Sequence, residues 1–289
     1  MRLGGPVFST FETPEEWVAA HRALGYAAAF CPVGPEASDD EVTAYVEAAR
    51  EADLVIAEVG AWSNPVSPIE SVRQASLEHC KARLALADRI GARCCVNVSG
   101  SRGPQDAEKV TGAGWAAGHP DNLTDATFDL VVASVREIID NVQPTRTFYC
   151  LETMPWMYPD SPQNYLRLIR AIDRDRFAVH LDPVNLICSP QRYYNNAALI
   201  RECFETLGPS IKSCHAKDTL LSGTLTVHLD EVRPGVGALD FRVFLTAAEA
   251  LDPDLPIMLE HLPGEEQYRL AADHLRAVAA EDGVSVKTI

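Results

Sequence analysis

Residues 147–152 read TFYCLE, a short apolar run that ends on a carboxylate. FAVHLD at 177–182 and PIMLE at 256–260 also end on a carboxylate, and IKSCH at 211–215 ends on a histidine. Continuous apolar strands are typical of a parallel sheet that is covered by helices. These four runs therefore predict buried parallel strands, each ending in a side chain able to bind a metal or move a proton.

Further strands and helices extend this pattern over the whole chain. The predicted strands are 2–8, 25–30, 54–59, 93–98, 147–152, 177–182, 211–215 and 256–260; the predicted helices are 14–24, 39–52, 68–91, 125–142, 162–172, 191–207, 240–251 and 265–281. Eight strand–helix units in 289 residues predict an α/β fold, a (β/α)8 TIM barrel, which needs about 250 residues. An open doubly wound sheet is the alternative, but no glycine fingerprint follows the first strand. No linker interrupts residues 1–289, so we expect a single domain.

The predicted helix starts carry capping signals. Thr13 and Ser67 are each followed by a proline and, at the third position, by a glutamate that completes a capping box. Ser38 begins another box, and Ser161 repeats the cap and the proline without the glutamate. These signals place the first turns of four helices.

Composition excludes several classes of function. The formal net charge of −16 argues against non-specific binding to nucleic acid or anionic membranes. No apolar run approaches the roughly 20 residues of a membrane span, and the N-terminal segment lacks the apolar core of a signal peptide. We therefore expect a cytoplasmic protein. The eight cysteines form no CxxC pair and several lie in strand-like runs, which favours free, buried thiols.

Four of the predicted strands end in Glu152, Asp182, His215 and Glu260. Neighbouring barrel strands converge at one end, so these side chains can meet within a few ångströms. Three carboxylates there would repel one another unless a cation neutralised them. Oxygen ligands and one imidazole suit Mn²⁺, Co²⁺, Mg²⁺ or Zn²⁺. Any one of these residues could be a cap, a turn residue or a core histidine; the recurrence at matching strand ends carries the prediction.

Alternation along the strands adds further candidates. His180 shares a face with Asp182, where it could orient a metal ligand or contact substrate, and Lys217 continues the face of His215. His261 directly follows Glu260 and is expected to point the other way.

Two long strand-to-helix connections, 99–124 and 216–239, are predicted to form lids or substrate walls at the C-terminal face. Arg233 lies in a Gly/Pro turn, where it suits a hydroxyl-rich or anionic ligand. Aromatic and polar residues in the connections after neighbouring strands could stack on or hydrogen-bond a sugar. These candidates for substrate binding are Trp62, Asn64, Trp115 and Trp156.

These motifs resemble the xylose-isomerase-like barrels of the sugar-phosphate isomerase/epimerase superfamily, which includes ketose 3-epimerases and hydroxypyruvate isomerases. The matching segments are CLETM around Glu152, HLDPVN around Asp182, CHAKD around His215, MLEHL around Glu260 and PGVGALDF at 234–241. The ketose epimerases carry a substrate-contacting histidine three residues after the strand-six Asp, and this chain has Asn185 there. Asn185 could still hydrogen-bond a hydroxyl, so it joins the substrate-binding candidates.

The resemblance implies a divalent-metal-dependent sugar isomerase or epimerase. It would transfer a proton next to a carbonyl through a metal-stabilised enediolate, with Glu152 and Glu260 as the acid/base pair. Mn²⁺ is the first choice of metal, and a homodimer or homotetramer is implied. A lyase that cleaves keto-glycosides or dehydrates keto sugars is an alternative, as is a non-catalytic sugar-binding barrel or subunit of a complex. Phosphodiester hydrolysis would need a three-metal cluster rich in histidines. It is disfavoured because the whole chain has only eight histidines and because its charge is acidic.

Overall fold

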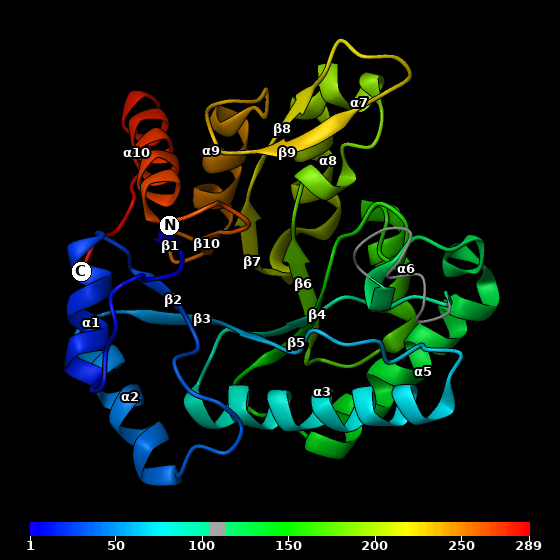
Figure 1. The fold of residues 1–289 in the computed structure, drawn as a ribbon, viewed down its shortest axis with the longest axis horizontal. Coiled ribbons are helices and arrows are strands. Elements are labelled where there is room, and N and C mark those ends of the chain that lie inside the picture. Colours follow the sequence, from blue (N-terminus) through cyan, green and yellow to red (C-terminus); the bar gives the residue numbers. More distant parts are fainter. Residues whose placement is uncertain (104–113) are drawn as a thin grey trace.

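The computed structural model describes residues 1–103 and 114–289. Parallel strands close into a barrel in the order β1-β10-β7-β6-β5-β4-β3-β2, with helices packed around its outside (Figure 1). The barrel strands are β1 (Arg2–Gly4), β2 (Ala28–Phe30), β3 (Val55–Gly60), β4 (Cys94–Asn97), β5 (Phe148–Glu152), β6 (Phe177–Leu181), β7 (Ile211–Ala216) and β10 (Pro256–Leu259). The predicted (β/α)8 TIM barrel is confirmed.

Helices follow the barrel strands in the predicted alternation. They are α1 (Pro14–Ala23), α2 (Asp39–Glu51), α3 (Glu70–Ile90), α5 (Asp125–Val142), α6 (Pro162–Ile172), α7 (Pro190–Tyr194), α8 (Asn196–Leu207), α9 (Phe241–Leu251) and α10 (Glu265–Glu281). Short 3-10 helices are η2 (Gly114–Ala116), η3 (Pro120–Leu123), η4 (Val184–Leu186) and η5 (Gly208–Ser210). None of the helices within the described residues is long and apolar enough to cross a membrane.

Three of the four predicted caps are confirmed. The hydroxyls of Thr13, Ser38 and Ser161 accept the backbone N–H groups expected of helix N-caps. The Ser67 prediction is wrong. Ser67 Oγ accepts from Ile69 N and so holds a turn, and α3 begins only at Glu70.

Several elements differ in extent from their prediction, and two of the differences have a clear local cause. The first strand is shorter than 2–8, because Pro6 has no N–H to donate to a neighbouring strand and the chain leaves the sheet after Gly4. The predicted helix 191–207 is divided into α7 and α8 at Asn195, whose φ of −126° and ψ of 34° lie outside the helical region.

The barrel is closed where the two chain ends meet. Arg2 on β1 forms ion pairs with Asp53 and Asp254, and Lys287 N donates to Met1 O at 3.0 Å. Both termini therefore lie on the same side of the molecule (Figure 1). Side chains between the barrel and its helices form one large apolar core, and the barrel interior contains a smaller cluster of Cys94, Val96, Cys150 and Ala178. All eight cysteines are free, as predicted; six are buried, Cys31 is partly buried, and the expectation of burial is wrong for Cys188, which is exposed.

The connection 216–239 contains a hairpin of β8 (Asp218–Leu221) and β9 (Leu229–Val232), which stands outside the barrel (Figure 1). Asp218 fixes the turn that follows it. Its Oδ1 accepts the N–H groups of Thr219 and Leu239 at 2.8 and 2.9 Å, and its Oδ2 accepts those of Gly235 and Gly237 at 3.0 Å each. One buried carboxylate therefore satisfies four backbone donors beside the open end of the barrel.

We expect Asp218→Asn to lower the free energy of unfolding by about 1–3 kcal/mol, because an amide N–H₂ replaces one acceptor oxygen and faces buried donors. Urea unfolding monitored by circular dichroism measures the change. Asp230→Asn on the exposed edge of β9 is the matched control, with an expected change within about 0.5 kcal/mol. Equal stability of the two variants would contradict the assigned role of Asp218.

Candidate metal centre

The ends of four neighbouring strands bring the predicted ligand residues together. Glu152 ends β5, Asp182 follows β6, His215 lies near the end of β7, and Glu260 follows β10. These strands are adjacent in the barrel, and one ligand atom from each residue lies within 4.8 Å of the others. The group is able to hold a metal ion.

Asp182 is both a turn residue and a candidate ligand. Its Oδ1 accepts the backbone N–H groups of Val184 at 2.9 Å and Asn185 at 3.2 Å. Its Oδ2 is buried and forms an ion pair with Lys217 Nζ at 2.8 Å. The turn fixes the carboxylate so that one oxygen is directed into the site.

The imidazole of His215 lies between two carboxylates. His215 Nδ1 is 3.1 Å from Glu152 Oε1 and 2.8 Å from Glu260 Oε1. Glu260 Oε1, like Asp182 Oδ2, is buried, and its contacts among the described residues are with groups that can carry positive charge. Two oxygens of this kind beside an imidazole nitrogen fit a divalent cation, which would take their lone pairs directly.

Lys217 provides positive charge within this group. Its Nζ is 2.8 Å from Asp182 Oδ2, 3.5 Å from Glu152 Oε1 and in contact with Glu260 Oε1. Burial lowers the pKa of Lys217, but the surrounding carboxylates outweigh that effect and raise it well above its ordinary value. The ammonium is therefore charged. It compensates only one of the three carboxylate charges, so the group can still accommodate a divalent cation.

A cavity of about 620 Å³ lies over the candidate ligands. Trp62, Trp115 and Trp156 line it and are partly exposed. Other lining residues are Phe30, Val98, Ala116, Glu152, Met154, Asn185, His215, Lys217, Glu231, Glu260 and His261. A mainly apolar wall with a charged floor is typical of a small-molecule site.

Five of the eight predicted substrate-binding residues line this cavity: Asn185, Lys217, Trp62, Trp115 and Trp156. Asn185 Nδ2 also donates to Glu152 Oε1 at 3.2 Å, which ties it to a candidate ligand. Part of the predicted wall 99–124, namely residues 104–113, lies outside the described residues.

Three predicted substrate-binding residues are not among the described residues that line the cavity. His180 is fully buried one layer deeper, because it precedes Asp182 by two residues on the same strand. Asn64 is buried and bonds to the backbone of Ser101 at 2.8 and 3.0 Å, so it joins two loops. The Nη1 of Arg233 donates to the carbonyl of Pro234.

Among the polar residues that line the cavity, the sequence prediction missed two, His261 and Glu231. The expectation that His261 points away is wrong, because its φ of +58° ends the strand alternation directly after Glu260. His261 Nδ1 lies 3.2 Å from Glu231 Oε1, and Glu231 comes from the hairpin strand β9. Neither a left-handed backbone nor a hairpin return is visible in the apolar pattern on which the prediction was based.

Comparison with known proteins places the chain in a family. The family model described as xylose isomerase-like TIM barrel matches residues 18–278. No curated protein matches the chain in sequence.

Similar solved structures all share the barrel at low sequence identity. One is a xylose isomerase-like TIM barrel protein from Mycobacterium smegmatis in complex with magnesium (18% identity, 93% of this chain and 89% of that one, TM-score 0.65). Another is 3-keto-D-glucoside 4-epimerase from E. coli (14%, 97% and 99%, TM-score 0.68). A third is endonuclease IV from Thermus thermophilus (14%, 97% and 100%, TM-score 0.69). At these identities the likeness shows the fold alone.

Metal binding is expected to release a proton. Burial lowers the pKa of His215, but Glu260, Glu58 and Glu152 outweigh it and raise the pKa well above 6.5. The metal-free imidazole is therefore protonated at neutral pH, and a cation must displace the Nδ1 proton. At pH values below the pKa of His215, the affinity for Mn²⁺ should therefore rise about tenfold with each unit by which the pH is increased.

Titration calorimetry in buffers of different ionisation enthalpy measures this proton release. The pKa of His261 is also raised, mainly by its hydrogen bond with Glu231, so the His261→Gln variant serves as the control. Proton release that persists in this variant comes from His215. A dissociation constant that does not change between about pH 6 and about pH 8 would contradict the prediction.

Proposed function

Because the chain belongs to the family of xylose isomerase-like TIM barrels, we propose that it is a divalent-metal-dependent sugar isomerase or epimerase. The reaction proposed is proton transfer next to a carbonyl group. One observation carries the proposal. The floor of a cavity of about 620 Å³ brings together four largely buried side chains of the types that bind metal ions, namely Glu152, Asp182, His215 and Glu260.

Four residues would hold the cation, namely Glu152, Asp182, His215 and Glu260. A divalent cation there would supply Lewis-acid stabilisation of the negative charge that develops on a substrate oxygen when a neighbouring carbon loses its proton. Mn²⁺ is our first choice, with Co²⁺, Mg²⁺ and Zn²⁺ as alternatives.

Glu152 and Glu260 are the proposed acid/base pair. They come from β5 and β10, which are separated in the barrel by β6 and β7, so they approach a bound ligand from different directions. Each carboxylate has two oxygens, and one of them can move a proton while the other remains a ligand. Removal from one face and return to the other gives epimerisation, whereas return to the adjacent carbon gives isomerisation.

The cavity walls support a sugar or sugar derivative as the ligand. Trp62, Trp115 and Trp156 present aromatic surface, with 41, 37 and 44% of each residue exposed. Asn185 and Lys217 supply donors near the floor. Aromatic faces and a few directed polar groups are the combination that recognises a ring with both C–H and hydroxyl surfaces.

A lyase is the second candidate, favoured by the size of the cavity. The same proton removal next to a carbonyl would expel a leaving group from the β-carbon, as in keto-glycoside cleavage or keto-sugar dehydration. A cavity of about 620 Å³ has room for a second ring or an aglycone. Net charge −16 opposes the phosphodiester chemistry named for endonuclease IV, because a DNA backbone would be repelled.

The proposal predicts exchange of one substrate C–H in D₂O by the Mn²⁺-loaded protein. Free ketoses, aldoses, keto-glycosides and sugar phosphates are to be screened by proton NMR. Glu152→Gln should reduce the exchange rate by about 10²–10⁴-fold, because an amide cannot accept the proton. Glu78→Gln, an exposed carboxylate on α3, is the control and should exchange at the native rate.

Metal content after dialysis tests the other half of the proposal. About one bound divalent ion per chain is expected. A native protein without stoichiometric metal would overturn both enzyme candidates and leave a non-catalytic sugar-binding barrel. Undiminished exchange by Glu152→Gln with metal bound would remove Glu152 from the acid/base role.

A further inference from the structure

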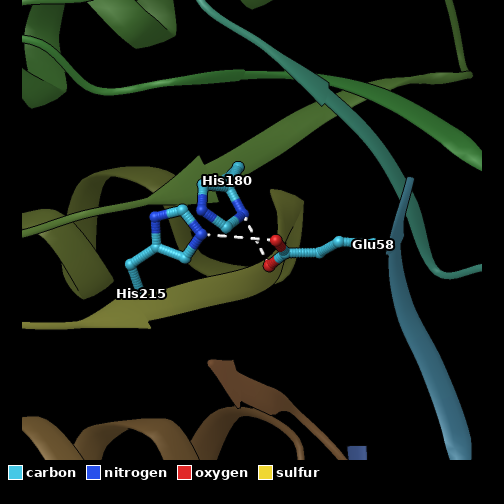
Figure 2. A group of neighbouring side chains, drawn as sticks. All are labelled: Glu58, His180 and His215. Carbon is cyan, nitrogen blue, oxygen red and sulfur yellow. Dashed lines mark hydrogen bonds and ion pairs between the residues drawn. The ribbon is translucent and has the colours of Figure 1, made fainter. Parts of the chain in front are cut away.

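One carboxylate lies inside the barrel beneath the candidate metal centre. Glu58 on β3 is 2% exposed, and it extends toward two imidazoles from β6 and β7 (Figure 2). Glu58 Oε2 lies 3.3 Å from His215 Nε2, and Oε1 lies 3.4 Å from His180 Nδ1. Ser213 Oγ also donates to Oε1 at 3.2 Å.

A buried carboxylate is costly unless partners compensate its charge. No lysine or arginine within the described residues forms an ion pair with Glu58. Cys94, which is in register with Glu58 on the neighbouring strand β4, belongs to an apolar cluster. The compensation must therefore come from the two imidazoles and the Ser213 hydroxyl.

His180 packs against His215 inside the barrel. The two rings stand edge-on, with centroids 4.1 Å apart and planes at 74°. A ring in this position limits the rotation of His215 and so helps to keep its Nε2 directed at Glu58.

The two nitrogens of His215 face different groups. Nδ1 is directed at Glu152 and Glu260. Nε2 is directed at Glu58 (Figure 2). A neutral imidazole has one nitrogen with a proton and one with a lone pair, and only the lone pair can bind a metal. Whichever group accepts a hydrogen bond from one nitrogen therefore selects the other as the ligand.

We propose that Glu58 is a positioning residue, which accepts the Nε2–H of His215 and thereby holds the Nδ1 lone pair toward the metal centre. This inference rests on the metal-dependent function proposed above. It extends the site by one strand, since β3 contributes no candidate ligand of the centre itself.

A second ion held by Glu58, His180 and His215 is the competing explanation, because one ligand atom from each lies within 4.8 Å of the others. Two features favour the hydrogen bond. The group is almost completely enclosed, with at most 2% exposure of any member. His215 would also have to lose both ring protons to bind two ions, whereas it need lose only one to bind a single ion at Nδ1.

The test compares the Mn²⁺ dissociation constants of two variants at position 58. Glu58→Met removes the acceptor and should weaken binding by about 10–100-fold, the usual effect of losing a group that orients a metal ligand. Glu58→Gln retains an acceptor oxygen without the charge and should lose less. Cys94→Ala, which changes the same buried layer without contacting His215, should bind with native affinity and controls for packing.

A second readout measures the protonation of the His215 ring in the native protein, so it needs no folded variant. Ring ¹⁵N shifts of His215 in the Zn²⁺-loaded native protein should show the proton on Nε2 and the metal on Nδ1. A proton on Nδ1, or native affinity in a folded Glu58→Met, would overturn the proposal. Two ions in the native protein and one in Glu58→Gln would overturn it as well, because Glu58 would then be a ligand.

Neither readout requires turnover, so the two proposals can fail separately. A chain that binds metal but exchanges no substrate proton contradicts the proposed reaction, and the affinities and shifts still decide the role of Glu58. Native proton exchange together with native affinity in Glu58→Met contradicts only the role of Glu58.

Discussion

Repulsion among buried carboxylates is the constraint on which the open end of the barrel depends. Glu152, Asp182 and Glu260 have ligand atoms within 4.8 Å of one another at the ends of neighbouring strands. Lys217 and the protonated ring of His215 offset part of this charge. The remaining negative charge destabilises the metal-free protein, and a bound divalent cation would compensate it. We therefore regard the local electrostatics as an indication of function and not of stability.

The strand period then arranges the polar residues in layers. Side chains two residues apart on one strand lie on the same face, about 6–7 Å apart along it. Thus His180 lies beneath Asp182, and Ser213 beneath His215. Glu58 joins this deeper layer from β3. The apolar cluster around Cys94 and Cys150 fills the interior beside them, so the polar contacts have a low-dielectric surrounding in which each one is strengthened.

The sequence predicted the parts of this molecule that follow from regular periods. Apolar runs ending in polar residues located the candidate ligands, and most hydroxyl–proline signals located helix starts. It could not locate His261, because a left-handed φ cancels the alternation on which the prediction was based. Glu231 reaches the cavity only through the return strand of a hairpin. Glu58 did leave a signal, since a lone carboxylate within the apolar run LVIAEV requires a buried partner, but its partners are distant in sequence.

The surroundings of the two proposed proton carriers are unequal. Burial raises the pKa of Glu260, but His215 and Lys217 outweigh it, so the pKa lies below its ordinary value and the carboxylate stays ionised. Glu152 shares both cationic neighbours, because its Oε1 lies 3.1 Å from His215 Nδ1 and 3.5 Å from Lys217 Nζ. It also accepts a hydrogen bond from the amide of Asn185, whereas the further neighbour of Glu260 is the imidazole of His261, at 3.7 Å. The two proposed proton carriers therefore share a cationic floor and differ in the group that orients each of them.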